Sequence, residues 1–364
     1  MADYAQNNVN AIGKITSKSL LTYINKCCSE ILDNIFTVLP VVDLLMFAAT
    51  SKHHFILANS HICMRCLHLI CPFIAIPENL LLTMHITGAL ISGSSVLSVL
   101  EPPSNWNPNN FNIYVPWGYH FIVVKLFKLN GFVVTSGQQY LSSAFPTAIK
   151  PSYAGSGIAF IIKMAKDKLI VDVVVSQQGR PPFYCIANFH STAVMNFISA
   201  DGLFSAYPSL TNAGISMASK IPHASDPNQP TAKLIVAYNK YQERGYKICN
   251  IPDIPGLANL FPNVKPNLPH NCKHSYSCPQ TLRSTFDDGC MFFPLSHDRR
   301  TEVLQPGFPS HGLYRQERGV AWCIGGEHCD GNSPTLCPFV SWKTDNVSLI
   351  LLLWHGLLVM HRVP

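Results

Sequence analysis

Two asparagines have the spacing of a pair of metal ligands, a role in which carboxylates bind more strongly than amides do. Asn110 and Asn112 flank Phe111 at the start of the alternating segment 111–115. Because side chains two apart on a strand share a face, both amides are expected opposite the apolar residues of that segment. Two carboxylates on such a face would hold a hard cation such as Mg²⁺, whereas neutral amide oxygens hold it only weakly. The pair therefore has the spacing of a metal site without its charge.

Asp172 is the third polar side chain of interest, and it interrupts the β-branched run 168–175. A carboxylate among Ile and Val side chains is costly to bury unless it is paired or ligated. Two placements remain open for it: a paired position within the sheet, or an edge strand on which the carboxylate faces solvent. Upstream, Gly93-Ser94 predicts the start of a helix that ends at Glu101-Pro102-Pro103.

This order of features resembles the nucleotidyltransferase superfamily. In that family a Gly-Ser turn holds a triphosphate, and three acids on two strands hold two metal ions. The resemblance implies that Gly93 and Ser94 match the turn, that Asn110 and Asn112 occupy two of the acid positions, and that Asp172 matches the third. Asparagine is nearly isosteric with aspartate, so the fold survives the exchange and the charge does not. These five residues are therefore vestigial candidates, and no residue is assigned as catalytic.

The N-terminal region predicts helices. Ile31, Leu32, Ile35, Phe36 and Leu39 form one apolar stripe at helical spacing. Pro40 is expected to end this helix, Asp43 suits the first turn of the next one, and a third helix is predicted from 53 to 69.

Residues 29–55 resemble an F-box. The matching residues are Glu30, Ile31, Leu32, Ile35, Phe36, Leu39, Pro40, Asp43, Leu44, Leu45, Ser51 and Lys52. The stretch departs from the pattern where Cys27-Cys28 replaces the usual Leu-Pro and where Phe55 replaces the customary Trp. The resemblance implies docking on the Skp-type adaptor of a cullin-RING ubiquitin ligase. The implied contact residues are Ile31, Ile35, Phe36, Leu39, Pro40 and Leu44. The alternative is an ordinary three-helix segment.

Together with the later stretches NFHSTAVMNFISADGLFSAYPSLT and YNKYQERGY, these features resemble a set of fungal proteins labelled F-box-like. The predicted fold class is α+β. Its expected parts are a loose tail (1–19), a three-helix F-box-like module (20–78), a small mixed-sheet nucleotidyltransferase-like domain (79–210), an irregular Pro- and Cys-rich extension (211–345) and an apolar tail (346–364). Ser191 and Asp201-Gly202 predict the two ends of a helix in the third part. A helix is also predicted there over 119–129, ended by Asn130-Gly131, and another over 232–244 in the extension, ended by Gly245.

The chain has 13 cysteines and its N-terminus lacks an apolar signal-like stretch, so reduced thiols in the cytoplasm or nucleus are expected. Two cysteine pairs, each with five residues between its members, predict a structural zinc site. Its ligands would be Cys272, Cys278, Cys323 and Cys329. The alternative is a set of separate buried thiols, because zinc ligands are usually spaced by two to four residues.

The composition of the chain argues against two classes of function, nucleic-acid binding and membrane spanning. The formal charge of +6 comes from scattered Lys and Arg, so no nucleic-acid partner is expected. The apolar run 347–360 is too short for a membrane span. The leading hypothesis is a non-catalytic adaptor that links a Skp-type protein to an unknown protein partner. The rivals are an active metal-dependent nucleotidyltransferase that uses Asp172 with acids such as Glu101, and an ordinary structural protein.

Overall fold

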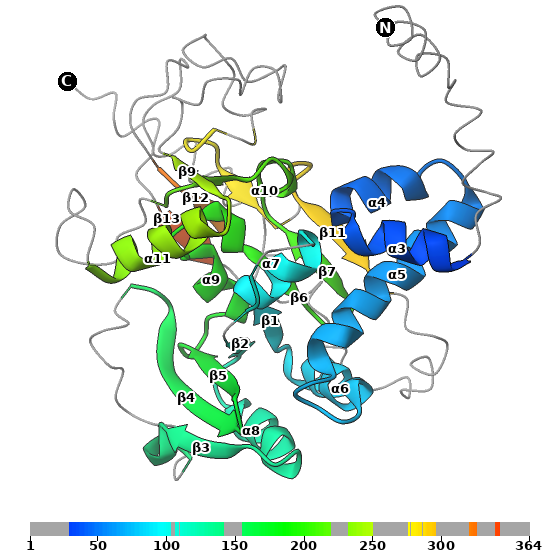
Figure 1. Ribbon diagram of the computed structural model, residues 1–364. Coiled ribbons are helices and arrows are strands. Elements are labelled where there is room, and N and C mark those ends of the chain that lie inside the picture. The colour runs from blue at the N-terminus through cyan, green and yellow to red at the C-terminus, as the bar shows by residue number, and fades with distance from the viewer. Residues whose placement is uncertain are drawn as a thin grey trace, which may run out of the picture.

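The computed structural model describes residues 29–102, 106–108, 110–141, 155–219, 232–249, 276, 278–285, 287–295, 320–325 and 339–342. Within these residues a mixed eight-stranded sheet runs through the centre, with a group of helices at one end (Figure 1). The predicted mixture of helices and strands is confirmed, but the sheet is larger than the small one expected. In the described part of the chain, no helix is long and apolar enough to cross a membrane.

The helical group consists of α3 (Ser29–Val38), α4 (Val41–Ala48), α5 (Lys52–Ile70) and α6 (Pro77–Thr87). Pro40 separates α3 from α4, because the residue before a proline is pushed out of the helical region. Ser51 starts α5, where its hydroxyl accepts a hydrogen bond of 3.1 Å from the backbone N–H of His54. The three predicted helices are thus confirmed.

The apolar core of this helical group continues into the central sheet. One cluster of buried side chains contains Leu32, Phe36, Val41, Leu44 and Ile62 together with Phe111, Ile113 and Val173 of the sheet. A second cluster lies on the opposite face of the sheet and contains Leu90, Tyr114 and Val174. The central sheet is therefore covered on both faces, and the core of the helical group is continuous with the core on one of these faces.

The central sheet has the strand order β11-β7-β6-β1-β2-β5-β4-β3. Its strands are β1 (Leu90–Ser92), β2 (Phe111–Val115), β3 (Val133–Ser136), β4 (Ile158–Lys166), β5 (Leu169–Ser176), β6 (Asn196–Ile198), β7 (Gly202–Ser205) and β11 (Met291–Pro294). The β2–β5 pair is parallel, and the other pairs are antiparallel. The connecting helices are α7 (Ser94–Leu100), α8 (His120–Leu129), α9 (Pro182–Ala187) and the 3₁₀ turns η1 (Gln138–Tyr140) and η3 (Thr192–Val194). The predicted strands near 111–115 and 168–175 and the predicted helices after Gly93 and Tyr119 are confirmed.

The predicted helix between Ser191 and Gly202 is wrong, because this stretch forms η3 and the hairpin β6–β7. Asp201-Gly202 is a hairpin turn rather than a helix end: the N–H of Ser199 donates to the carbonyl of Gly202 at 2.8 Å. Across the hairpin, the rings of Phe197 and Phe204 stack with centroids 4.6 Å apart. Cross-strand pairing overrode the helical spacing of the apolar residues.

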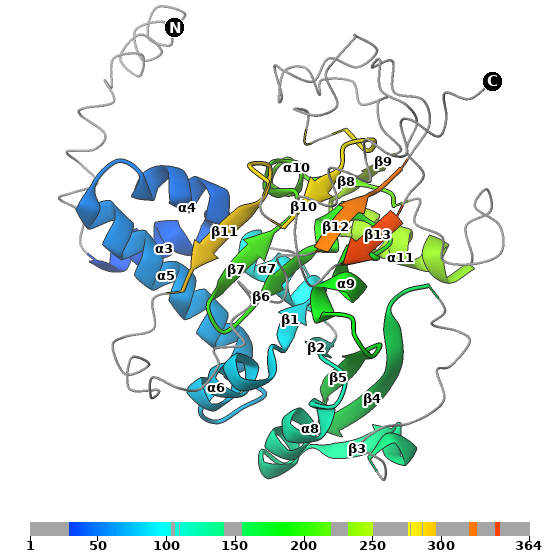
Figure 2. The same ribbon diagram turned by 180° about the vertical axis from the view of Figure 1, so that it is seen from behind.

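The extension predicted to be irregular contributes regular structure where it is described. It contains α10 (Pro208–Asn212), β8 (Ile215–Met217), α11 (Ala232–Glu243), β9 (Lys247–Cys249), β10 (Arg283–Ser284), β12 (Val320–Cys323) and β13 (Phe339–Trp342), and of these only α11 was expected. Strand β11 also belongs to it and lies along the edge of the central sheet beside the helical group (Figures 1 and 2). The extension is thus part of the central body.

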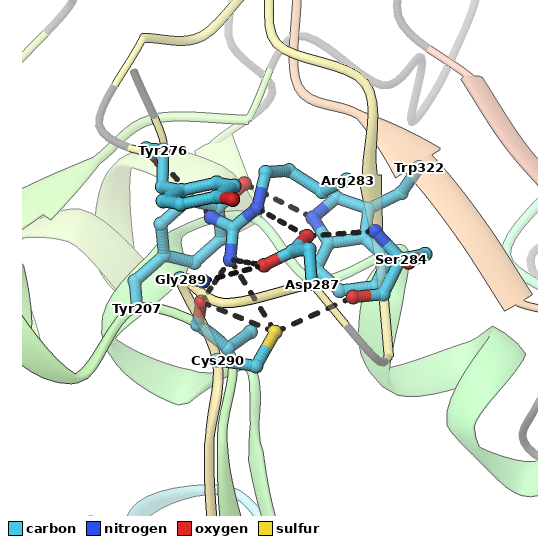
Figure 3. Close-up of polar contacts among 9 residues, drawn as sticks. Tyr207, Tyr276, Arg283, Ser284, Asp287, Gly289, Cys290 and Trp322 are labelled. Atoms are coloured by element: carbon cyan, nitrogen blue, oxygen red, sulfur yellow. Dashed lines mark hydrogen bonds and ion pairs between the residues drawn. The ribbon is translucent and has the colours of Figure 1, made fainter. Parts of the chain in front are cut away.

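Arg283 anchors the extension through a buried ion pair (Figure 3). Its side chain is fully buried, and its Nε and Nη2 donate to the two carboxylate oxygens of Asp287 at 2.7 and 2.8 Å. Nη2 also donates to the carbonyl of Ala206 at 2.8 Å, and the guanidinium lies 4.4 Å from the Tyr207 ring centre. Because Ala206 and Tyr207 lead into α10, these contacts join β10 to the central body.

Candidate functional site

The vestigial site predicted from the sequence lies where β1, α7, β2 and β5 meet. Asn112 pairs in register with Ser92 on one side and with Asp172 on the other. Gly93 follows β1 directly and caps the N-terminus of α7. The structure therefore brings together Gly93, Asn112 and Asp172, which are far apart in the sequence.

Gly93 is required at this turn for two reasons. Its φ is +82°, in the region that side chains rarely adopt, and a Cβ at this position would lie 3.0 Å from Nδ2 of Asn112. The next residue, Ser94, is buried at the start of α7. Ser95 fixes the approach of β2, because its hydroxyl donates to the carbonyl of Asn110 at 2.9 Å.

Asp172 is paired, and its partners are an amide and an ammonium group. Nδ2 of Asn110 donates to one carboxylate oxygen, Oδ2, at 2.9 Å. Nζ of Lys163 lies 4.0 Å from the other oxygen, Oδ1, and the Asp172 side chain is only 14% exposed. The open question of the Asp172 environment is thus settled in favour of the paired, mostly buried position.

Two oxygen atoms in this site have no hydrogen-bond partner among the described residues: Oδ1 of Asn112 and Oδ1 of Asp172. They belong to residues directly opposite each other in the β2–β5 register. The Asp172 carboxylate and the Lys163 ammonium group have opposite charges, so the net charge of this cluster of side chains is near zero. Such a set lacks the anionic oxygens with which proteins hold Mg²⁺.

Lys163 was missed by the sequence analysis, although the chain contains a signal for it. Strands β4 and β5 form a hairpin whose two-residue turn is Asp167-Lys168, with Asp167 at a positive φ of 52°. Counting back from this turn places Lys163 opposite Asp172. The lysine follows from the hairpin register once residues 158–166 are recognised as a strand.

Glu101, the acid invoked for the rival hypothesis, does not join Asp172. It caps the C-terminal end of α7, whereas Gly93 caps the N-terminal end. A helix of this length separates the two ends by roughly 10 Å. Burial, followed by the proximity of Asp43, raises the pKa of the Glu101 carboxyl to about 8, and Arg65 opposes this rise. Glu101 is therefore largely neutral at pH 7.

The predicted contact residues of the helical group divide into three kinds. Ile31 and Ile35 are 49% and 40% exposed, and Leu39 and Pro40 are partly buried. Phe36 and Leu44 belong to the interior, with exposures of 3% and 0%. Burial therefore places Phe36 and Leu44 in the packing between the helices, whereas Ile31 and Ile35 face outward on α3.

Arg65 fixes the end of α3 against the rest of the molecule. Its guanidinium donates to the carbonyls of Phe36 and Leu39, the latter at 2.7 Å, and to the carbonyl of Val99 at 3.3 Å. Burial lowers the pKa of Arg65 to about 10. The side chain thereby ties the end of α3 to α7, the helix that Gly93 caps.

The zinc prediction falls partly outside the described residues, because Cys272 and Cys329 are not among them. Cys278 and Cys323 are buried, and the thiol of Cys323 donates to the carbonyl of Pro279 at 3.3 Å. Within the described ranges no group of three or more His, Cys, Asp or Glu side chains is arranged to hold a metal ion. The four-cysteine site remains a prediction.

No family model matches the chain, and no curated protein or solved structure matches it either. The relation to F-box and nucleotidyltransferase families therefore depends on the residues quoted above. The described geometry defines a mixed α/β protein with a neutralised polar site in its central sheet and an exposed aliphatic helix at one end.

Proposed function

We propose that this chain is a non-catalytic F-box-like adaptor. In this proposal the helical group binds a Skp-type adaptor protein through α3, and the nucleotidyltransferase-like domain presents a surface to a second protein partner. The setting would be a cullin-RING ubiquitin ligase in the cytoplasm or nucleus.

The observation that carries the proposal is an aliphatic stripe on the outer face of α3. Ile31, Ile35 and Val38 are 49%, 40% and 50% exposed, and their spacing of four and three residues puts them on one side of the helix. Burying such side chains stabilises a complex by about 25 cal/mol per Å² of apolar surface. The contacts of Arg65 with the end of α3 hold this stripe in place without a partner.

The polar site supports the non-catalytic half of the proposal. Asn110 and Lys163 occupy the surroundings of Asp172, where a nucleotidyltransferase would need further carboxylates. An amide and an ammonium group leave no excess negative charge with which to attract Mg²⁺ and a triphosphate. The domain therefore suits recognition better than phosphoryl transfer.

Binding to a purified Skp-type protein, measured by calorimetry, tests the proposal. Ile31→Glu with Ile35→Glu is expected to weaken binding at least a hundredfold, because it places two charges in an apolar contact. Leu129→Glu with Val133→Glu is the matched control, since these aliphatic side chains, on α8 and β3, are 76% and 63% exposed. Equal binding by both double variants, or no binding by the unmodified chain, would reject the adaptor role.

A further inference from the structure

A pocket of about 340 Å³ lies between the C-terminal end of α7, α10 and the turn that follows α11. Its volume falls within the range of about 300–1,000 Å³ that is typical of small-molecule sites. The pocket is at the opposite end of α7 from Gly93, so it is separate from the vestigial site. None of the contacts proposed for the adaptor role involves it.

Arg244 is the cationic side chain among the residues that line the pocket, which also include the acids Glu101 and Glu243. Its guanidinium carbon lies 3.9 Å from the centre of the Trp106 ring, which also lines the pocket. Stacking of this kind fixes the guanidinium plane and leaves its edge available for hydrogen bonds. Nη1 of Arg244 is nevertheless buried and has no hydrogen-bond partner among the described residues.

Thr211 supplies a second polar atom that lacks a partner. The residue is 2% exposed and lines the pocket, and its hydroxyl Oγ1 makes no hydrogen bond within the described part of the chain. A buried donor and a buried hydroxyl left unpaired in residues that line one pocket are costly for the folded state, and a ligand that pairs with them would relieve the cost.

The charges around the pocket favour an anion. Arg244 and the neighbouring Lys240 are cationic, and burial lowers the pKa of both. Glu243 is the acid beside them, whereas burial and Asp43 raise the pKa of Glu101 to about 8, so that Glu101 adds little negative charge at pH 7. Lys240 lies outside the lining of the pocket, where Arg244 is the cation and Glu243 the ionised acid. With Lys240 counted, the two cations outnumber the one ionised carboxylate, and a protonated Glu101 carboxyl is itself a hydrogen-bond donor.

We propose that this pocket binds a small anion, a carboxylate or a phosphate, through Arg244, with Thr211 as a second contact. A guanidinium matches the paired oxygens of either group. Because water does not reach Nη1 or Oγ1, binding involves a small movement of these side chains toward the pocket. The proposal is independent of the adaptor role, and failure of one leaves the other intact.

Thermal unfolding of the full chain in rising concentrations of inorganic phosphate or malonate, at constant ionic strength, tests the proposal. At least one anion is expected to raise the melting temperature with saturation. The half-saturating concentration should rise at least tenfold in Arg244→Gln and a few-fold in Thr211→Val. Arg180→Gln is the matched control, because Arg180 stacks on Tyr184 at 4.1 Å outside the pocket, and it should leave this concentration unchanged.

Tryptophan fluorescence gives a second readout, which follows the unmodified chain directly. Anion binding should alter the emission of the unmodified chain, and Trp106→Phe should lose this change while retaining a ring for Arg244. The preferred anion distinguishes a phosphate ligand from a carboxylate ligand. Absence of saturable stabilisation by both anions, or the same loss of stabilisation in Arg244→Gln and Arg180→Gln, would overturn the proposal.

Discussion

Replacing Glu101 with glutamine tests how the end of α7 is packed against the helical group. The carboxyl lies at the C-terminal end of a helix, where the dipole disfavours a negative charge. Burial and then Asp43 raise its pKa from 4.5 to about 8, against the opposing effect of Arg65. In the unfolded chain the same carboxyl ionises near its ordinary pKa, so folding at neutral pH takes up a proton.

The sign and size of the effect follow from this difference in pKa. The folded state binds one more proton than the unfolded state between pH 4.5 and about 8, so stability falls as the pH rises through that window and levels off above it. The full interval corresponds to at most about 5 kcal/mol. Solvent screening at this partly exposed carboxyl reduces the expected cost to on the order of 2 kcal/mol.

Urea unfolding at about pH 5 and about pH 8.5 measures this cost. Glu101→Gln is neutral in both states, so it should resemble the unmodified chain at the lower pH and exceed its free energy of unfolding by roughly 2 kcal/mol at the higher pH. Glu78→Gln, at an exposed position on α6, is the control. Parallel pH profiles for Glu101→Gln and the unmodified chain would refute the buried, raised-pKa environment of Glu101.

Three further outcomes are expected. Asp287→Ala should lower the free energy of unfolding by roughly 3 kcal/mol in chemical denaturation, because it strands a fully buried guanidinium, and adding Arg283→Met should recover part of the loss. Asn110→Asp with Asn112→Asp should cost about 2 kcal/mol without metal, and Mg²⁺ or Mn²⁺ should then raise the melting temperature in this variant but not in the unmodified chain; a further Asp172→Asn change should abolish this response. Elemental analysis of protein purified without chelator should find close to one zinc per chain if the four predicted cysteines are ligands, and chelator should then lower stability.

Local patterns in the sequence predicted the elements that have a recognisable signal within them or directly beside them. Pro40 and the apolar spacing around it defined α3 and α4, and Asn130-Gly131 marked the end of α8. The β-branched run ending at Val175 identified β5. In each case the signal lies within about ten residues of the element, and tertiary contacts did not have to override it.

The elements that were missed depend on partners far away in the chain. Strand β11 is four residues long and ends in Pro294, and its pairing with β7 joins residues about 90 positions apart. No local pattern specifies such a pairing, because an edge strand of this kind is selected by the sheet it completes. The same reason explains why the sequence located Asn110, Asn112 and Asp172 but not the guanidinium of Arg283 among three aromatic rings.

The neutral character of the polar site is a property of the sheet register as well as of residue type. The Asp172 carboxyl is accommodated inside a strand because Asn110, just before β2, and Lys163 on β4 reach it from either side of β5. In a metal-binding arrangement the cation itself would balance several carboxylates; here a covalently attached ammonium group balances the single one that remains. In the Asn110→Asp, Asn112→Asp variant, a metal ion would therefore have to compete with Lys163 for Asp172. Lys163→Gln should accordingly strengthen the metal response of the Asn110→Asp, Asn112→Asp variant, whereas Lys166→Gln, farther along the same strand and beside Phe132, should leave it unchanged.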